Sequence, residues 1–338
     1  MSHYFLTCLR PVRSGMILFS TLFLLACGTV AHSTSYRVSM EPDDLKSSQY
    51  MQLKLEGSLG ISGAKVNDLD VTELSDLAWD ADEKLLYAIS DRGYLYTIRL
   101  SINNNKLTKA DIISATTLKG KNKQPVRGRD QDSEGMTIKN ANNGRAGDAE
   151  LIISFEGNSR LVRYNTRGDY LGELPLPKKL SNHRNFRHGN KMLESLTTHP
   201  KYGLITAAEL PLKANPENQQ TLYSQRGQEW HFPRHKAAES SVTALEVLPN
   251  GDILVLERAF SGIFSPLVVS LRQVMLNQCD KFSHCKTRDL AVFNSGEGWN
   301  IDNFEGLTHL GGNRYLMVSD DNKNPLQQTL LVMFEITP

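Results

Sequence analysis

The chain repeats one short motif five times, and this repetition constrains its fold more than any other feature. Each copy has a short strand of alternating polar and apolar residues, a turn rich in Asp, Asn, Gly or Pro, and a second, more apolar strand. The copies begin at Ser75, Ser133, Leu193, Val242 and Phe304. No long stretch has an apolar period near 3.6, which argues against helices. The sequence therefore predicts five β-hairpins.

Further strand candidates follow each hairpin. The first hairpin is followed by YLYTIRL and ADIISATTL, whereas the fifth is followed only by TLLVMFEI. We expect its missing fourth strand to come from YMQLKLEGSLGI, residues 50–61. Four-stranded sheets repeated around an axis, with the ring closed by joining the two termini, form a β-propeller. We predict an all-β chain with five four-stranded blades. Two alternatives are a sixth blade hidden in residues 101–130 or 259–300, and an open β-sandwich.

The N-terminus has the pattern of an export signal. Arg10 and Arg13 precede the apolar run MILFSTLFLLA, which is too short to span a bilayer comfortably and typical of a signal peptide. The run ends in LLACG, which resembles the lipobox of bacterial lipoproteins and makes Cys27 the lipidated first residue after cleavage of residues 1–26. The alternative is an ordinary signal cleaved after Ala31.

This interpretation sets the expected domain boundaries and location. Residues 32–48 are polar and without pattern, so we expect residues 27–48 to form a flexible tether, followed by the propeller over residues 49–338. We expect an exported protein, held in the cell envelope only by its lipid anchor and facing the periplasm from the outer membrane.

Cysteine usage fits an oxidising compartment. Cys8 is removed with the signal and Cys27 carries lipid, which leaves Cys279 and Cys285 in CDKFSHC. Only His284 lies near this pair in sequence, so a metal site lacks ligands, and we predict a disulfide.

Acidic residues recur at both ends of the repeated hairpins. In an antiparallel hairpin the start of the first strand lies beside the end of the second, so both positions share one rim of the propeller. Nine of the ten aligned positions are carboxylates. The strand starts are Asp76, Glu134, Glu194, Thr243 and Glu305, and the strand ends are Asp91, Glu156, Glu209, Glu257 and Asp320.

Crowded carboxylates either hold protons or require a cation, and several oxygen ligands suit Ca²⁺. We therefore predict a Ca²⁺ site at this rim. The alternative is that each acid pairs with a nearby arginine or caps a turn. The predicted ligands are Asp76, Asp91, Glu134, Glu194, Glu305 and Asp320.

Basic residues lie near the same rim in sequence. Arg127 and Arg129 precede the second hairpin, Arg187 and His188 precede the third, and Arg92 follows the first. Arginine forks beside a metal suit an anionic substrate, so we predict that the four arginines hold a small anion. Arg129, Arg187 and His188 are the catalytic candidates. The alternative is a set of solvated loops that balance the nearby acids.

Charge and motifs exclude several functions. The net charge of +1 gives no basic field for nucleic acid. The sequence contains no G-x-S-x-G, H-E-x-x-H or G-x-x-x-x-G-K-[ST] motif, so serine-hydrolase, zinc-peptidase and P-loop chemistry have no support. A closed propeller needs no partner for stability, and we expect a monomer.

The motifs DSEGMT, ESLT and NFEGLTHLGGNRYLMVSDDN, with the later QQTLLVMFEI, resemble the phytase-like family, also described as esterase-like activity of phytase, over about residues 50–338. This resemblance implies an exported propeller that hydrolyses an ester or phosphate ester. The β-propeller phytases, which look similar in fold, bind several Ca²⁺ ions at an acidic channel mouth. Two hypotheses follow: a Ca²⁺-assisted hydrolase, and a propeller of the cell envelope that binds a ligand or protein without chemistry.

Overall fold

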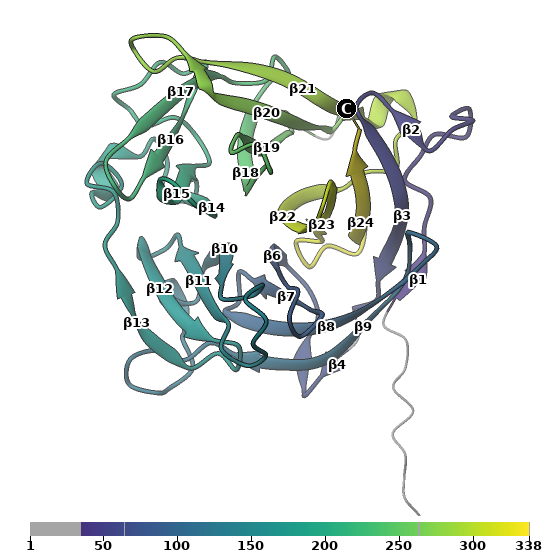
Figure 1. Ribbon diagram of the computed structural model, residues 1–338, viewed down its shortest axis with the longest axis horizontal. Helices are drawn as coiled ribbons and strands as arrows, with labels where there is room; N and C mark the ends of the chain where they lie inside the picture. Colours follow the sequence, from purple (N-terminus) through teal and green to yellow (C-terminus); the bar gives the residue numbers. More distant parts are fainter. Residues whose placement is uncertain (1–34, 64, 263, 338) are drawn as a thin grey trace, which may run out of the picture. The chain divides into compact units, whose positions relative to one another are not determined.

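The computed structural model describes residues 35–63, 65–262 and 264–337. The expected signal peptide and Cys27 lie outside these residues. Within them the chain forms strands and three short 3₁₀ helices, and it contains no α-helix. The 3₁₀ helices are η1 (Gly128–Asp130), η2 (His183–Asn185) and η3 (Ser295–Glu297). Figure 1 shows the strands as five sheets around a central axis, which confirms the predicted five-bladed β-propeller.

Blades one to four each consist of four consecutive antiparallel strands. Blade one contains β6 (Leu74–Asp80), β7 (Leu85–Ser90), β8 (Tyr94–Asn103) and β9 (Lys106–Thr117). Blade two contains β10 (Ser133–Lys139), β11 (Glu150–Phe155), β12 (Arg160–Asn165) and β13 (Tyr170–Leu174). Blade three contains β14 (Leu193–His199), β15 (Gly203–Ala208), β16 (Gln219–Ser224) and β17 (Glu229–Pro233). Blade four contains β18 (Ser240–Val247), β19 (Ile253–Ala259), β20 (Val268–Cys279) and β21 (Cys285–Asn294).

Blade five joins the two ends of the folded unit. Its strands are β22 (Asn303–Gly311), β23 (Arg314–Asp320), β24 (Thr329–Ile336) and β3 (Leu53–Ile61). The pairing of β24 with β3 confirms that an N-terminal strand closes the ring. Two short strands, β1 (Ser35–Arg37) and β2 (Gln49–Tyr50), pair with β3, and β4 (Lys65–Val66) pairs with β5 (Leu69–Asp70). The described residues contain no sixth blade.

The folded unit begins before the predicted boundary at residue 49. Strand β1 pairs with the outer edge of β3, with Ser35 opposite Ile61. Met40 is fully buried in the core shared by blades four and five. The expected tether is therefore wrong for residues 35–48, while residues 27–34 lie outside the described part. Polar residues can form this strand because an open sheet edge offers backbone groups to any sequence.

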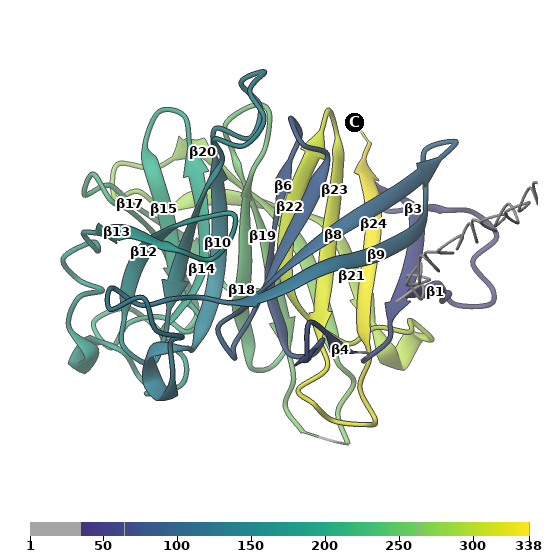
Figure 2. The ribbon, with the colours of Figure 1, turned by 90° about the horizontal axis from the view of Figure 1, so that it is seen from below.

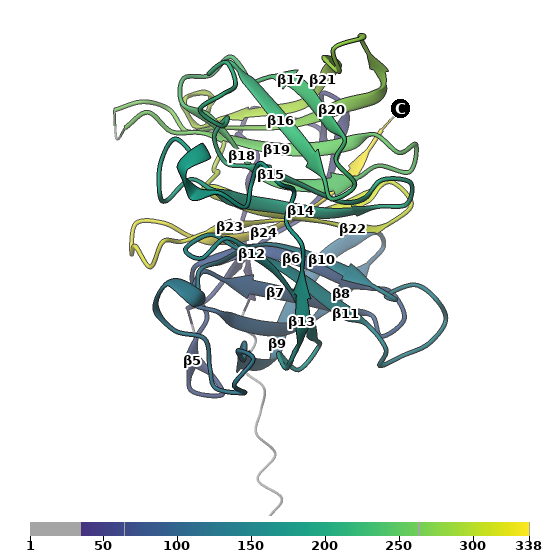
Figure 3. The ribbon, with the colours of Figure 1, turned by 90° about the vertical axis from the view of Figure 1, so that its left-hand side faces the viewer.

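The core lies between neighbouring blades. Leu196 of β14 packs against Ile152 of β11, which joins blades two and three, and Met136 of β10 packs against Ile89 of β7, which joins blades one and two. The second strand of each blade is therefore buried almost throughout and mostly apolar. Figures 2 and 3 show the strands spanning the ring, with loops gathered at its two ends. Those loops and the strand ends position the candidate sites.

Every inner strand begins with a β-bulge. In blade three, Leu193 pairs with Ala208 and Ser195 pairs with Ala207, so Glu194 has no opposite residue. Equivalent register shifts occur near the start of β6, β10, β18 and β22. A bulge re-aims the side chain of the extra residue. By this register the bulge residues are Ser75, Glu134, Glu194, Thr243 and Glu305.

Candidate metal centre

Eight carboxylates surround one hollow of about 440 Å³ at the end of the ring where the inner strands begin. We call it the acidic basin. Two basic residues, Lys191 and Arg258, share it, so acids outnumber bases by eight to two. The eight acids are Asp91, Asp132, Glu134, Glu156, Glu194, Glu209, Glu305 and Asp320.

Two structural positions supply most of these acids. Glu134, Glu194 and Glu305 are bulge residues at the start of the inner strands. Glu156 and Glu209 directly follow the second hairpin strands, which end at Phe155 and Ala208. Asp91 and Asp320 occupy the same strand-end position in blades one and five. The repeated hairpin therefore delivers acids from four of the five blades to one place.

Close approach of the inner strands explains the glycine after two of the bulge acids. A Cβ atom added to Gly306 would lie 2.8 Å from the Asp76 Cα atom, and one added to Gly135 would lie 2.8 Å from the Leu196 backbone nitrogen. Real Cβ atoms do not approach backbone atoms this closely. The Glu-Gly pair at these positions thus combines a carboxylate of the basin with a strand contact that only glycine permits.

The crowding perturbs the protonation of these acids. Burial, together with the negative charge of neighbouring acids, raises the pKa of Asp91, Glu156 and Glu305 to about 7 and that of Asp320 to about 8. Burial also raises the pKa of Glu194 well above its ordinary range, with Glu209 adding to the effect. Without a cation, the basin therefore holds several protons near neutral pH.

Three acids have the spacing expected of ligands to one ion. Carboxylate oxygens of Asp132, Glu134 and Glu156 all lie within 4.8 Å of one another. Two oxygens bound to the same Ca²⁺ at about 2.4 Å can be at most about 4.8 Å apart. The basin contains no His or Cys, so its donor set suits a hard cation. Sequence reasoning missed Asp132 because it precedes the repeated hairpin and so falls outside the aligned positions.

The two cations of the basin share one acid. Lys191 Nζ lies 2.8 Å from Glu209 Oε1, and Arg258 Nη2 lies 3.4 Å from the same oxygen. Among the described residues, the buried Nε–H of Arg258 and the buried Oδ1 of Asp91 have no hydrogen-bond partner. Both atoms belong to side chains that line the hollow.

Of the six predicted ligands, five line the basin and Asp76 does not. Asp76 is fully buried, and its Oδ1 accepts N–H bonds from Leu77 at 2.8 Å and Leu307 at 3.0 Å. Its Oδ2 accepts the Met136 N–H at 2.6 Å. Asp76 thus links the inner strands of three blades, and its assignment as a metal ligand is corrected. The bulge residue of blade one is Ser75, one position earlier.

The same shift by one residue affects blade four. Glu257 pairs with Val242, whereas the equivalent of Glu209 is Arg258. Glu257 is buried away from the basin, where its Oε2 lies 2.7 Å from Arg272 Nη1. Blade four therefore contributes a cation to the basin where an acid was aligned.

Two predicted anion-binding arginines are engaged elsewhere. Arg92 forms a two-pronged contact with Glu73, at 2.6 Å and 3.1 Å. Arg129 donates from Nε and Nη2 to the carbonyl oxygen of Gly157. Neither arginine lines the basin, and both hold loops at its edge.

The remaining candidates also lie outside the basin. Arg187 donates to the carbonyl oxygens of Pro211 and Asn215. Arg127 and His188 are exposed on their loops and do not line the hollow. The basic residues that the structure does bring to the basin, Lys191 and Arg258, were visible in the sequence only as neighbours of other basic or acidic residues.

The predicted disulfide is present. Cys279 and Cys285 are bonded, and they join the ends of β20 and β21 in blade four. This link closes the outer hairpin of one blade, away from the basin.

Comparison with known proteins adds the family. A family model named Phytase-like, described as "Esterase-like activity of phytase", matches residues 70–323, which is more than half of the chain. No curated protein matches the sequence. Among solved structures, one titled "Structure of Dos1 propeller" is 9% identical, with coverage of 82% of this chain and 72% of that chain and a TM-score of 0.36. On the strength of the family match, this chain belongs to the Phytase-like family.

Proposed function

We propose that the acidic basin binds Ca²⁺ and that the protein hydrolyses an ester, with phosphate esters as the first class to test. The observation that carries this proposal is the basin itself, where eight carboxylates face only two basic residues. Such an excess of buried negative charge requires protons or a metal ion. The family description points to an esterase- or phosphatase-like hydrolase.

We assign different roles to the acidic and the basic residues of the basin. Asp132, Glu134 and Glu156 would hold the ion, because their oxygens are close enough to share it. A bound Ca²⁺ would act as a Lewis acid toward the ester and would lower the pKa of water there. Lys191 and Arg258 would hold the anionic group of the substrate, since both extend into the hollow and the Arg258 Nε–H lacks a partner.

A second candidate is binding without hydrolysis. The observation that favours it is the pairing of both basin cations with Glu209, because a cation held by an acid is less available to a substrate. Under this alternative the basin would hold a ligand or a protein of the cell envelope by its charge alone, and no ester would be cleaved.

Export and anchoring are part of the proposal. The apolar run before LLACG and the Cys279–Cys285 disulfide both fit an exported protein. Among the described residues, no helix has the length and apolar character needed to cross a membrane. We propose an envelope protein attached through a lipid on Cys27. Labelling with radioactive palmitate should mark the protein and should fail on the Cys27→Ser variant.

The test of the enzymatic proposal is hydrolysis by the purified protein. p-Nitrophenyl phosphate and p-nitrophenyl acetate would be assayed with added Ca²⁺ and with chelator. We expect Ca²⁺-dependent release of p-nitrophenol that falls at least about tenfold in Lys191→Met, because one charged contact contributes about 1.5–3 kcal/mol.

His188→Ala is the matched control, since His188 is exposed on the loop before Lys191 but does not line the basin. Its rate should equal that of the unmodified protein. Ca²⁺ binding without turnover of any ester would support the second candidate, in which the protein binds a ligand without hydrolysing it. Turnover that persists in chelator would contradict the proposed role of the metal.

A further inference from the structure

A second hollow, of about 730 Å³, lies at the opposite end of the inner strands, and we propose that it binds a neutral polyhydroxylated ligand such as a short saccharide. We call it the distal pocket. The inner strands reach it only three or four residues after the acidic basin, for example at Thr137 beyond Glu134. It is distinct from the basin in both position and chemistry, so this inference does not rest on the proposed hydrolase activity.

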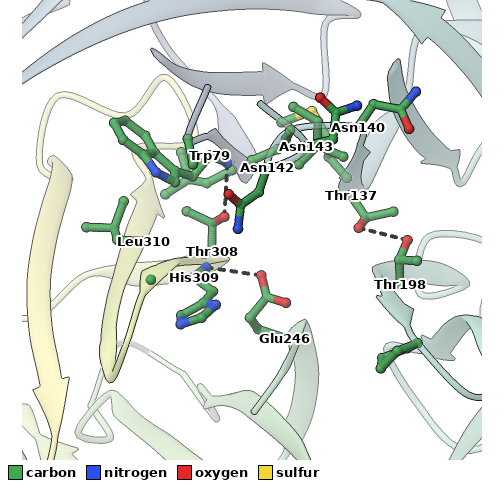
Figure 4. A pocket seen from close by; sticks show the side chains of 18 residues that line it. Trp79, Thr137, Asn140, Asn142, Asn143, Thr198, Glu246, Thr308, His309 and Leu310 are labelled. Atoms are coloured by element: carbon green, nitrogen blue, oxygen red, sulfur yellow. Dashed lines mark hydrogen bonds between the residues drawn. The ribbon is translucent and has the colours of Figure 1, made fainter. Parts of the chain in front are cut away.

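The walls of the distal pocket present hydroxyl, amide and aromatic groups. Figure 4 shows Thr137 and Thr198 on one side of the pocket. Trp79, Thr308 and His309 lie on the opposite side in the same view. Between the two groups, asparagine side chains of the β10–β11 loop reach over the pocket. This mixture of one indole face and several neutral polar groups is suited to a ligand with an apolar ring face and many hydroxyl groups.

The distal pocket differs from the acidic basin in the charge of its lining residues. Of the residues that the structure describes, no Lys or Arg lines it, so it offers no permanent positive charge to a phosphate or a carboxylate. Its one acidic side chain is Glu246. A ligand of this pocket therefore needs hydrogen-bond donors and acceptors but no negative charge.

Glu246 is held in a fixed orientation. Its Oε1 accepts the Val247 N–H at 2.7 Å and the Thr197 hydroxyl at 3.1 Å, and its Oε2 accepts the His309 N–H at 3.1 Å. These three donors already compensate much of the carboxylate charge, which disfavours a cationic ligand. One lone pair of Oε2 is left for a neutral donor, such as a sugar hydroxyl.

Two polar groups at the distal pocket are available to hydrogen-bond a ligand. Among the described residues, neither the Trp79 indole N–H nor the side-chain amide of Asn142 has a hydrogen-bond partner. Trp79 also stacks on no aromatic ring in the part of the chain that the structure describes, whereas His309 stacks on Tyr315 with ring centroids 4.9 Å apart. The indole face and the amide are therefore available to a ligand at the same time.

The floor of the pocket isolates it from the basin. Leu77 and Met136 line the distal pocket, and their backbone N–H groups both donate to the buried carboxylate of Asp76. This cross-link ties neighbouring inner strands together between the two sites. Binding at one site and chemistry at the other can thus be tested separately.

Tryptophan fluorescence of the purified protein provides the first test. Trp230 and Trp299 are 7% and 4% exposed, whereas Trp79 is partly exposed in the pocket wall, so an added saccharide should report mainly through Trp79. We expect maltotriose or triacetylchitotriose to give a saturable change. The affinity should be the same at low salt and at about 1 M NaCl, where charges are screened within about 3 Å.

Calorimetry on variants would locate the binding. We expect Asn142→Ala to weaken saccharide binding about fivefold, the size of one neutral hydrogen bond, and Trp79→Ala to weaken it at least about tenfold. Asn142 is exposed on a loop, so its variant should fold normally even if Trp79→Ala does not. Glu194→Gln in the acidic basin is the control and should leave saccharide affinity unchanged.

Three results would overturn the proposal. The first is the absence of saturable binding for both saccharides. The second is binding that Asn142→Ala does not weaken. The third is tighter, salt-sensitive binding of spermidine at the same pocket, which would identify a site for cations. The hydrolysis assay described above is unaffected by any of these outcomes, so the two proposals fail independently.

Discussion

Replacement of Asp76 separates a structural role from a metal-binding role. In Asp76→Asn the amide oxygen can still accept from Leu77 and Leu307, but the amide nitrogen would face the Met136 N–H that now donates to Oδ2 at 2.6 Å. One buried donor left unpaired costs about 1–3 kcal/mol, and the two opposed donors repel, so we expect a loss of about 2–3 kcal/mol. Asp76→Ala orphans all three donors and should cost about 4–6 kcal/mol.

These costs convert into melting temperatures. For a domain of this size each kcal/mol shifts the midpoint by about 2 °C, so Asp76→Asn should melt about 4–6 °C lower and Asp76→Ala about 8–12 °C lower. Circular dichroism melts in chelator measure the shift, and calorimetric titration with Ca²⁺ measures the affinity. The Ca²⁺ affinity of Asp76→Asn should stay within about twofold of the unmodified protein, because Asp76 does not line the acidic basin.

The converse pattern would refute this reasoning. If Asp76→Asn melted normally but lost Ca²⁺ binding, Asp76 would be a ligand and the strand-linking role would be wrong. Glu194→Gln is the matched comparison, because it removes a basin carboxylate that has no ion pair among the described residues. It should weaken Ca²⁺ binding without lowering the melting temperature in chelator.

Three further predictions concern pH, packing and a buried ion pair. Since burial raises the pKa of Asp320 from 3.8 to about 8, the folded chain binds this proton more tightly than the unfolded chain, and stability in chelator should fall as pH rises from about 4 to about 8. Asp320→Asn should flatten that profile in thermal melts, and an unchanged slope would contradict the assignment. Gly306→Ala should destabilise by about 1–3 kcal/mol, because its Cβ would lie 2.8 Å from the Asp76 Cα atom of the neighbouring inner strand; a normal melt would show that these two strands can separate freely. Arg272→Met should cost about 3–5 kcal/mol by leaving the buried Glu257 unpaired, and the double variant with Glu257→Gln should recover part of the loss.

Much of the fold follows from the sequence pattern because the repeated hairpin is a local feature. Strand, turn and strand lie next to one another in the chain, so the alternation of residues and the turn composition identify them without tertiary knowledge. The closing strand, Leu53–Ile61, was identifiable because blade five lacked a fourth strand in its own sequence. The edge strand Ser35–Arg37 was not, since it is held by backbone bonds that leave no pattern in its side chains.

Seven of the nine aligned carboxylates line the acidic basin as predicted, and the other two are wrong by one residue of register. Asp76 and Glu257 each lie one position from the residue that occupies the basin position, Ser75 and Arg258 respectively. A shift of one residue moves a strand side chain to the other face, and the bulge at the start of every inner strand adds such a shift. Aligning the copies on the buried leucine that follows the bulge, such as Leu77, would have exposed the error.

The arginines show a different limit. Their sequence positions beside the acidic motifs were read correctly, but the direction of a long side chain in a loop depends on which carbonyl or carboxylate group lies within reach. Arg129 reaches the carbonyl of Gly157, a residue on another loop, and Arg92 reaches Glu73. Neither contact leaves a signal in the spacing of residues, so the two basic residues that line the acidic basin, Lys191 and Arg258, are identified only in the assembled ring.

Calcium titration of the purified protein by calorimetry tests the central claim most directly. We predict saturable binding that is lost or weakened at least about tenfold in Glu134→Gln, whose carboxylate lies in the group of three with mutual spacing within 4.8 Å. A rise in melting temperature with added Ca²⁺ should accompany it in the unmodified protein and disappear in the variant. No heat of binding, together with melts that are indifferent to Ca²⁺ and chelator, would show that the basin holds protons instead of a metal and would remove the basis for a metal-assisted hydrolase.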